Sequence, residues 1–110
     1  MFTIDPDPKF THVVKVRVPV DGGFAEQSFK ATFRVIPAEE AATYDLSTGA
    51  DSAAFLRRAI VSMDELVGAD GQTTVPYSDA LRDQLLAVSY VRSALGRTYF
   101  EAVAGAPLGN

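Results

Sequence analysis

The chain has 110 residues, of which 47% are hydrophobic and 22% charged, a length and composition typical of one globular domain. Its net charge is −4 and its ten Lys and Arg residues are scattered, which argues against binding to nucleic acid or to an anionic membrane. The absence of cysteine excludes disulfides, thiolate zinc sites and thiol nucleophiles, and no apolar run is long enough to span a membrane. We therefore expect a soluble, cytosolic protein.

Residues 1–10 are predicted to form an extended N-terminal arm. Pro6 and Pro8 alternate with acidic residues, a pattern that favours extended, solvated backbone. The segment lacks the basic and apolar regions of a secretion signal. A free terminus and an arm docked through its apolar side chains both fit the sequence. Those side chains are Phe2, Ile4 and Phe10.

Residues 12–20 and 28–35 are predicted to form an antiparallel hairpin. Apolar residues alternate with other residues in both runs, which is the period of a strand with one buried face. Asp21-Gly22-Gly23 between them is typical of a tight turn. Pro19 has no amide hydrogen, so it should lie at a sheet edge or near the strand's end. The inward-facing residues are expected to be Val14, Val16, Val18, Val20, Phe29, Ala31, Phe33 and Val35.

The pattern changes from strand to helix after Pro37. One helix is predicted over residues 38–46, and Ser47-Thr48-Gly49 should break it. A second helix is predicted to begin with Asp51 or Ser52 as its N-cap and to run to about residue 62. Its apolar stripe would consist of Phe55, Leu56, Ala59, Ile60 and Met63.

Residues 67–86, with the sequence VGADGQTTVPYSDALRDQLL, form the most motif-like polar segment. Asp70-Gly71 predicts a tight turn, Pro76 should end the extended part, and Ser78 is the expected N-cap of a helix. The segment lacks the Gly-Lys-Ser/Thr ending of a phosphate-binding loop and the alternating acids of an EF-hand. We interpret it as a hairpin, a stop and a capped helix.

Helical pattern then continues to about residue 104, and Ser89 either caps a last helix or marks a kink. Gly96 inside this helix is interpreted as a close approach of two backbones. The inner faces of the two helical segments should carry Leu81, Leu85, Leu86 and Val88, and then Val91, Leu95, Thr98, Ala102 and Val103.

Strands first and helices after predict an α+β fold. We expect an N-terminal antiparallel β-hairpin or small sheet, followed by a bundle of about four helices packed on it. Residues 11–105 should form this single domain, and residues 106–110, with Pro107 and Gly109, a flexible C-terminal tail.

Residues that commonly carry chemistry are few. His12 is the only histidine and is expected to be a surface or packing residue, so a zinc site would need at least three carboxylates. No serine lies in a nucleophile-elbow pattern, and the acids at Asp64, Glu65 and Asp70 are interpreted as solvated turn residues. We expect no catalytic residue, metal or cofactor, although the sequence leaves a pair of catalytic carboxylates open.

The order of the predicted elements resembles the tail assembly chaperones of long-tailed bacteriophages and prophages. Four segments between about residues 10 and 105 are similar to this family: HVVKVRVPVDGGFAEQSFKATFRVI, PAEEAATYDL, FLRRAIVSMDELVGADGQTTVPYS and LRDQLLAVSYVRSALGRTYFEAVAG. They match its valine-rich hairpin, its acidic-alanine helix, its helix followed by Asp-Gly and Pro-aromatic-Ser, and its two closing helices. The family often has a tryptophan where Met63 or a neighbour stands here, which leaves the subfamily open.

This resemblance implies a role without catalysis. Proteins of the family bind the tape measure protein and keep it soluble before the tail tube forms around it. They are commonly made in a short form and a longer, frameshifted form, and they are absent from the finished virion. The implied partners are the tape measure protein, a frameshifted longer form of this chain and a second copy of itself, in the host cytoplasm.

A chaperone of this kind needs exposed aromatic or apolar side chains that accept varied segments. The candidate partner-binding residues are Tyr77, Tyr90, Tyr99, Phe100, Phe2 and Phe10, each of which could instead be a core or ordinary surface residue. The alternative class is a structural morphogenesis protein, such as a tail-tube or head-tail completion component, whose hairpin would be a polymerisation edge. A small enzyme is the third class, and the absence of the usual catalytic constellations argues against it.

Overall fold

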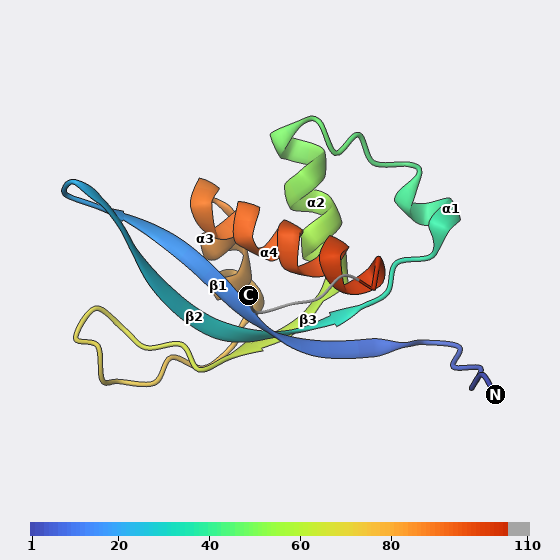
Figure 1. Cartoon of the computed structure of the whole chain (residues 1–110), viewed down its shortest axis with the longest axis horizontal. Coiled ribbons are helices and arrows are strands. Elements are labelled where there is room, and N and C mark those ends of the chain that lie inside the picture. The colour runs from blue at the N-terminus through green and yellow to red at the C-terminus, as the bar shows by residue number, and fades with distance from the viewer. Residues whose placement is uncertain (106–110) are drawn as a thin grey trace.

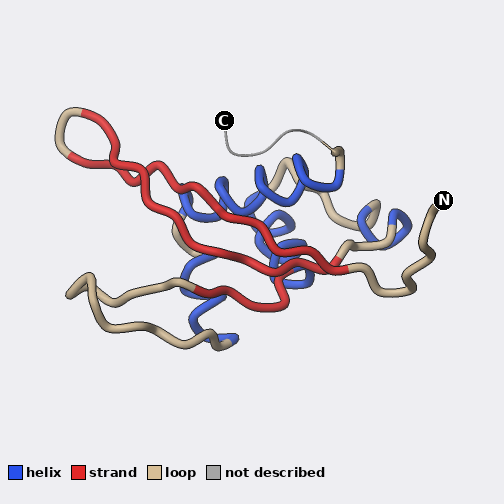
Figure 2. Tube along the Cα trace, turned by 60° about the horizontal axis from the view of Figure 1, so that its bottom comes forward, coloured by secondary structure: helices blue, strands red, loops and turns tan. Residues whose placement is uncertain are grey.

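A computed structural model describes residues 1–105 of the chain, so the tail expected at residues 106–110 lies outside the described residues. Strands β1 (Lys9–Val20), β2 (Gly23–Arg34) and β3 (Ile60–Asp64) form an antiparallel sheet in the order β1-β2-β3. Four helices follow β2 in the chain, and the larger ones cover one face of the sheet (Figures 1 and 2). They are α1 (Ala38–Ala41), α2 (Gly49–Ala59), α3 (Asp79–Leu86) and α4 (Ser89–Val103). The predicted α+β class is confirmed.

β1 and β2 form the predicted hairpin, and each strand has 12 residues. Val20 pairs with Gly23, so Asp21 and Gly22 make the loop, where Gly22 adopts a φ of 80° that favours glycine. β3 pairs with β2 only over residues 30–33, so the far half of the hairpin projects beyond the rest of the molecule (Figure 1). Residues 17–28 are exposed there except for the half-buried Val18.

The N-terminal arm is shorter than predicted because β1 already begins at Lys9. Phe10 is therefore a strand residue, and its ring centroid lies 5.3 Å from that of Phe33 in the core. Phe2 and Ile4 are 90% and 86% exposed, so the described arm does not dock through these two side chains.

The predicted bounds of the first two helices are wrong. α1 ends at Ala41 and gives way to turns, instead of continuing to residue 46. α2 ends at Ala59, and the next five residues form β3, because residues 30–33 of β2 offer an edge with which they pair. The N-cap of α2 is Thr48, whose hydroxyl accepts a hydrogen bond from the Asp51 N–H at 3.2 Å. Neither Asp51 nor Ser52 is the cap.

The polar segment at residues 67–86 has the predicted hairpin turn, stop and capped helix. Val67 and Thr74 form an antiparallel bridge, and the Ser78 hydroxyl accepts a hydrogen bond from the N–H of Leu81 at 3.0 Å. The Asp70 carboxylate accepts hydrogen bonds from the side chain and N–H of Thr73, which lower its pKa to about 2. This carboxylate is used to close its own turn.

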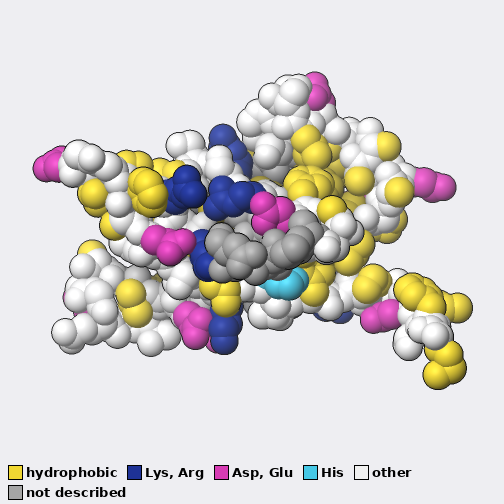
Figure 3. Space-filling view, viewed as in Figure 1, with side chains coloured by type: hydrophobic (Ala, Val, Ile, Leu, Met, Phe, Trp, Pro, Cys, Tyr) yellow, Lys and Arg dark blue, Asp and Glu magenta, His cyan; other side chains and the backbone are white. Residues whose placement is uncertain are grey.

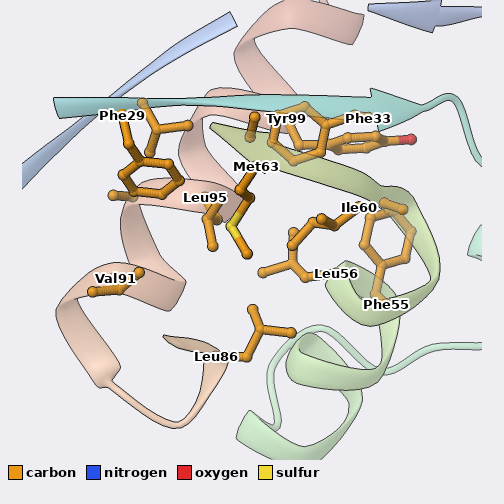
Figure 4. Packing of buried hydrophobic residues seen from close by; sticks show 14 of the residues in the cluster. Phe29, Phe33, Phe55, Leu56, Ile60, Met63, Leu86, Val91, Leu95 and Tyr99 are labelled. Atoms are coloured by element: carbon orange, nitrogen blue, oxygen red, sulfur yellow. The ribbon is translucent and has the colours of Figure 1, made fainter. Parts of the chain in front are cut away.

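The core lies between the sheet and α2, α3 and α4. Figure 4 shows Met63 of β3, Leu56 of α2 and Leu95 of α4 pointing toward one another beneath the sheet. The largest fully buried side chains are Phe33, Phe55, Leu56, Leu86, Leu95 and Val14. Residues of all three strands and of α2, α3 and α4 therefore share one cluster.

Three details of α4 differ from the prediction. Val103 is 44% exposed, so it does not belong to the inner face, and Ala94 and Tyr99 are buried there instead. A Cβ atom at Gly96 would meet only the Leu56 Cδ1 atom at 4.0 Å, which is an ordinary contact and no close backbone approach. Ser89 is the first helical residue rather than the cap, because Val88 occupies the N-cap position without a side-chain hydrogen bond.

Candidate partner-binding surface

The predicted partner-binding residues do not form one cluster. Tyr90, Tyr99 and Phe100 lie on α4, whereas Tyr77 precedes α3 and Phe2 lies in the arm. Their exposure also differs widely, from 90% for Phe2 to only 3% for Tyr99.

Tyr99 is a core residue, so its prediction as a surface contact is wrong. Its hydroxyl accepts a hydrogen bond from the N–H of Ile36 at 3.0 Å, and its ring packs edge-on against Phe33 and Phe55. The half-buried Phe10 ring covers Tyr99 from β1, with a centroid distance of 5.9 Å. Both side chains are thus used inside the domain.

Tyr77 is also partly used inside the domain. Its ring is half-buried and packs against the hydrophobic core, and this burial raises the pKa of its hydroxyl. Tyr77 is therefore only partly accessible to a partner, because one side of its ring is packed against the core.

The outer stripe of α4 holds the remaining aromatic candidates. We define this stripe as Tyr90, Ser93, Arg97 and Phe100, which are all exposed and recur every three or four residues. Tyr90 and Phe100 are 38% and 40% exposed. Ten residues of helix separate their Cα atoms by about 15 Å along the axis. The residues that face the sheet from the same helix include Val91, Leu95, Thr98 and Tyr99.

Phe100 is exposed but firmly held. Its ring stacks on Phe55 with a centroid distance of 5.3 Å and meets Tyr99 edge-on at 5.0 Å. Tyr44 packs against another side of Phe55, with centroids 5.4 Å apart. Tyr44, Phe55, Tyr99 and Phe100 thus form an aromatic cluster at the C-terminal end of α4, where Val103 is also exposed.

The end of the hairpin carries a second apolar surface that the sequence did not single out. Phe24 is 58% exposed and Val20 is 50% exposed, and the Arg17 guanidinium lies 5.1 Å from the centre of the Phe24 ring. The alternation assigned Val20 to a buried face, but no helix reaches that far along the hairpin (Figure 1). The structure extends the hairpin beyond the predicted strands, with Val20 and Gly23 paired around the turn, and this longer hairpin leaves its end without a helix to cover it.

An open hollow of about 320 Å³ lies between β1 and α4, next to the outer stripe. It is lined by Arg17, Ser89, Tyr90, Ser93 and Arg97. Figure 3 shows Lys and Arg side chains near the middle of this face of the molecule, with acidic side chains close beside them and hydrophobic side chains on the hairpin and the helices. Arg97 is held in place by a hydrogen bond from its Nη2 to the Lys15 carbonyl at 3.0 Å.

The carboxyl groups with clearly shifted pKa values within residues 1–105 are exposed and accept hydrogen bonds from neighbouring groups. No group of three His, Cys, Asp or Glu residues there could hold a metal ion. Hydrogen bonds from Arg82 and then Arg57 lower the pKa of Asp83, and the Ser47 hydroxyl and N–H lower that of Asp45. A carboxyl group acting as a general acid needs the opposite shift.

His12 is half-buried, and its ring lies 5.2 Å from that of Phe10, in a packing position. None of the helices in the described residues is long and apolar enough to cross a membrane. Comparison with protein-family models, curated proteins and solved structures finds no match to this chain. The function is therefore inferred from the residues and surfaces themselves.

Proposed function

We propose that this protein is a bacteriophage tail assembly chaperone that binds the tape measure protein and keeps it soluble until the tail tube assembles. The proposal starts from the resemblance of four segments between about residues 10 and 105 to that family. The structural observation that carries it is the outer stripe of α4, where Tyr90 and Phe100 are exposed although the same helix buries its other face.

This stripe has the chemistry that binding of a partly apolar client requires. An amphipathic helix docks through apolar residues that recur on one of its faces every three or four residues. Two aromatic rings about 15 Å apart, or nearly three helical turns, can therefore contact two apolar residues of one such face. Phe100 is fixed by its stacking on Phe55, so it loses little side-chain freedom on binding. The net charge of −4 favours solubility of the complex.

The same proposal includes the partners and place of action expected from the family. A frameshifted longer form of the chain would carry the same domain to the client, and copies of the domain would associate with one another. The complex would form in the host cytoplasm and would be absent from the finished virion.

Co-expression with the tape measure protein, expected to be the product of a long coiled-coil gene next to this one, tests this function. Wild-type chaperone should raise the soluble fraction of that product, and the Tyr90→Ser/Phe100→Ser variant should lose most of the increase. Val67→Ser is the matched control, because Val67 is 53% exposed but lies in the loop after β3. An unchanged solubility of the coiled-coil protein in the presence of wild-type chaperone would contradict the proposal.

The projecting hairpin favours a second candidate, a structural component of the tail tube or of the head-tail junction. Both faces of the hairpin are exposed over residues 19–28, and such a ribbon can pair with a neighbouring subunit in a polymer. Mass spectrometry of purified virions separates the two candidates. A structural component is present there in many copies, whereas a chaperone is absent.

A further inference from the structure

We infer that the hollow between β1 and α4 binds a carboxylate side chain of the partner segment that lies on the outer stripe of α4. This inference rests on the proposed chaperone function, and it adds the chemistry that the partner must present. Two guanidinium groups, from Arg17 of β1 and Arg97 of α4, line the hollow together with side chains that bear hydroxyl groups.

These two arginines differ from five other basic residues of the protein, each of which forms an ion pair with a carboxylate. Within residues 1–105, neither Arg17 nor Arg97 forms an ion pair, although the chain as a whole has an excess of acidic residues. The basic residues that pair with carboxylates of the described chain include Lys9, Lys30, Arg57, Arg58 and Arg82. Two unpaired guanidiniums beside one hollow leave a local positive charge on an acidic protein.

Two acidic residues lie near these arginines but form no ion pair with them. Glu26 stands directly opposite Arg17 in the β1–β2 ladder, and Glu101 follows Arg97 by four residues of helix, a spacing that permits pairing. Neither pair forms in the structure, because Arg17 lies over the Phe24 ring and Arg97 donates to the Lys15 carbonyl. Both contacts hold the guanidiniums beside the hollow while leaving other N–H groups to bind an acceptor.

The rest of the lining also favours an anionic acceptor. Ser89, Tyr90 and Ser93 bring hydroxyl groups, which can donate hydrogen bonds to a carboxylate. Ser89 and Tyr90 belong to the first turn of α4, where Val88 provides no side-chain cap, so the positive end of this helix is left without an acceptor from the cap residue. The planar fork of an arginine matches a carboxylate, whereas a lysine of the partner would be repelled.

The position of the hollow explains how it would act with the aromatic surface. Three residues of the outer stripe, Tyr90, Ser93 and Arg97, also line the hollow, and Phe100 follows Arg97 by one turn of the same helix. A partner segment with an acidic side chain in the hollow would place an apolar side chain about one turn away on Phe100. The carboxylate would thus fix the register and direction of a segment that apolar contacts alone would leave free to slide.

Binding of a soluble tape measure fragment to the Arg17→Gln/Arg97→Gln variant tests the inference. We expect its affinity to fall by roughly tenfold or more and to depend less on salt than that of the wild type. Lys30→Gln is the control, because Lys30 is an exposed basic residue of β2 whose ion pair with Glu65 lies outside the hollow. Unchanged unfolding midpoints should show that all variants are folded. If the double variant binds the fragment as tightly as the wild type does, the inference is overturned, while the chaperone function is left intact.

A second measurement does not depend on the tape measure protein. The ¹⁵N-labelled protein is titrated with an amphipathic helical peptide that bears a single glutamate, and separately with its glutamine counterpart. The side-chain Nε–H signals of Arg17 and Arg97 should move with the glutamate peptide alone. If these signals do not move, the inference is overturned. If they move but the wild type does not bind the tape measure fragment, only the proposed function is overturned.

Discussion

Tyr99→Phe removes one hydroxyl group from the core and leaves the aromatic ring in place. The Tyr99 hydroxyl accepts a hydrogen bond from the Ile36 N–H at 3.0 Å, and both residues are buried, at 3% and 5% exposure. After β2, the Val35 N–H still bonds to the Pro8 carbonyl across the sheet, but the following N–H, that of Ile36, has no partner on a strand. The substitution would leave that N–H buried without an acceptor.

The expected cost follows from this unsatisfied donor. A buried N–H that loses its only acceptor destabilises a protein by about 1–3 kcal/mol. The ring of the new phenylalanine still packs against Phe33 and Phe55, so no cavity adds to the cost. We expect the free energy of unfolding to fall by about 1–2 kcal/mol and the melting temperature to fall by roughly 4–8 °C per kcal/mol.

Urea unfolding of three proteins measures this effect: wild type, Tyr99→Phe and Tyr90→Phe. Tyr90 is 38% exposed, and its hydroxyl makes no hydrogen bond with residues 1–105, so the matched change should cost under about 0.5 kcal/mol. The slope of the unfolding free energy against urea should stay the same in all three. Equal midpoints for the two phenylalanine variants would refute the role assigned to the Tyr99 hydroxyl.

Three further changes give separate expectations. Ser78→Ala should cost about 1 kcal/mol in thermal unfolding because Ser78 caps α3, whereas Ser89→Ala should cost under about 0.5 kcal/mol because Ser89 caps nothing. Leu95→Ala should cost about 2–5 kcal/mol in urea unfolding, since Leu95 is 0% exposed, and Val103→Ala, at 44% exposure, under about 1 kcal/mol. Folding lowers the pKa of Asp70 from 3.8 to about 2, so its ionised form stabilises the fold above pH 4. Asp70→Asn should therefore be less stable than wild type at pH 7. The difference in unfolding free energy should shrink as the pH falls toward 2. If urea unfolding shows a constant difference over this range, the charge does not play this role.

The β1–β2 hairpin could be predicted because every signal for it is local. Alternation of apolar residues indicates strands, and Asp21-Gly22-Gly23 provides the turn residues. The same holds for the turn at Asp70-Gly71 and the cap at Ser78, where neighbouring residues make the hydrogen bonds. These parts of the fold depend on contacts within a few residues of the chain.

Strand β3 could not be predicted in this way. Phe55, Leu56, Ala59, Ile60 and Met63 are spaced like one helical stripe, and all five are indeed buried. The helix nevertheless ends at Ala59, because the following residues pair with residues 30–33 of β2, which are distant in the sequence. Apolar spacing thus identified buried residues correctly but did not distinguish a long helix from a helix followed by a strand.

The candidate site shows the same division. Tyr99 and Phe100 are adjacent aromatic residues on one helix, yet the first is 3% exposed and the second 40% exposed. The hollow is lined by both Arg17 of the first strand and Arg97 of the last helix, which are far apart in the sequence. No local pattern in the sequence reports either fact.

By itself, the sequence determined the α+β class, the hairpin, the capped helix after Ser78 and the residue types available for binding, because these follow from periodicity and local hydrogen bonding. Only the tertiary structure decided which aromatic rings are exposed, where α2 ends and which arginines line the same hollow. The physical reason is that α2 ends where β3 pairs with the distant β2, and that burial and side-chain proximity depend on how α4 is turned against the sheet. That orientation is set by packing between elements far apart in the chain.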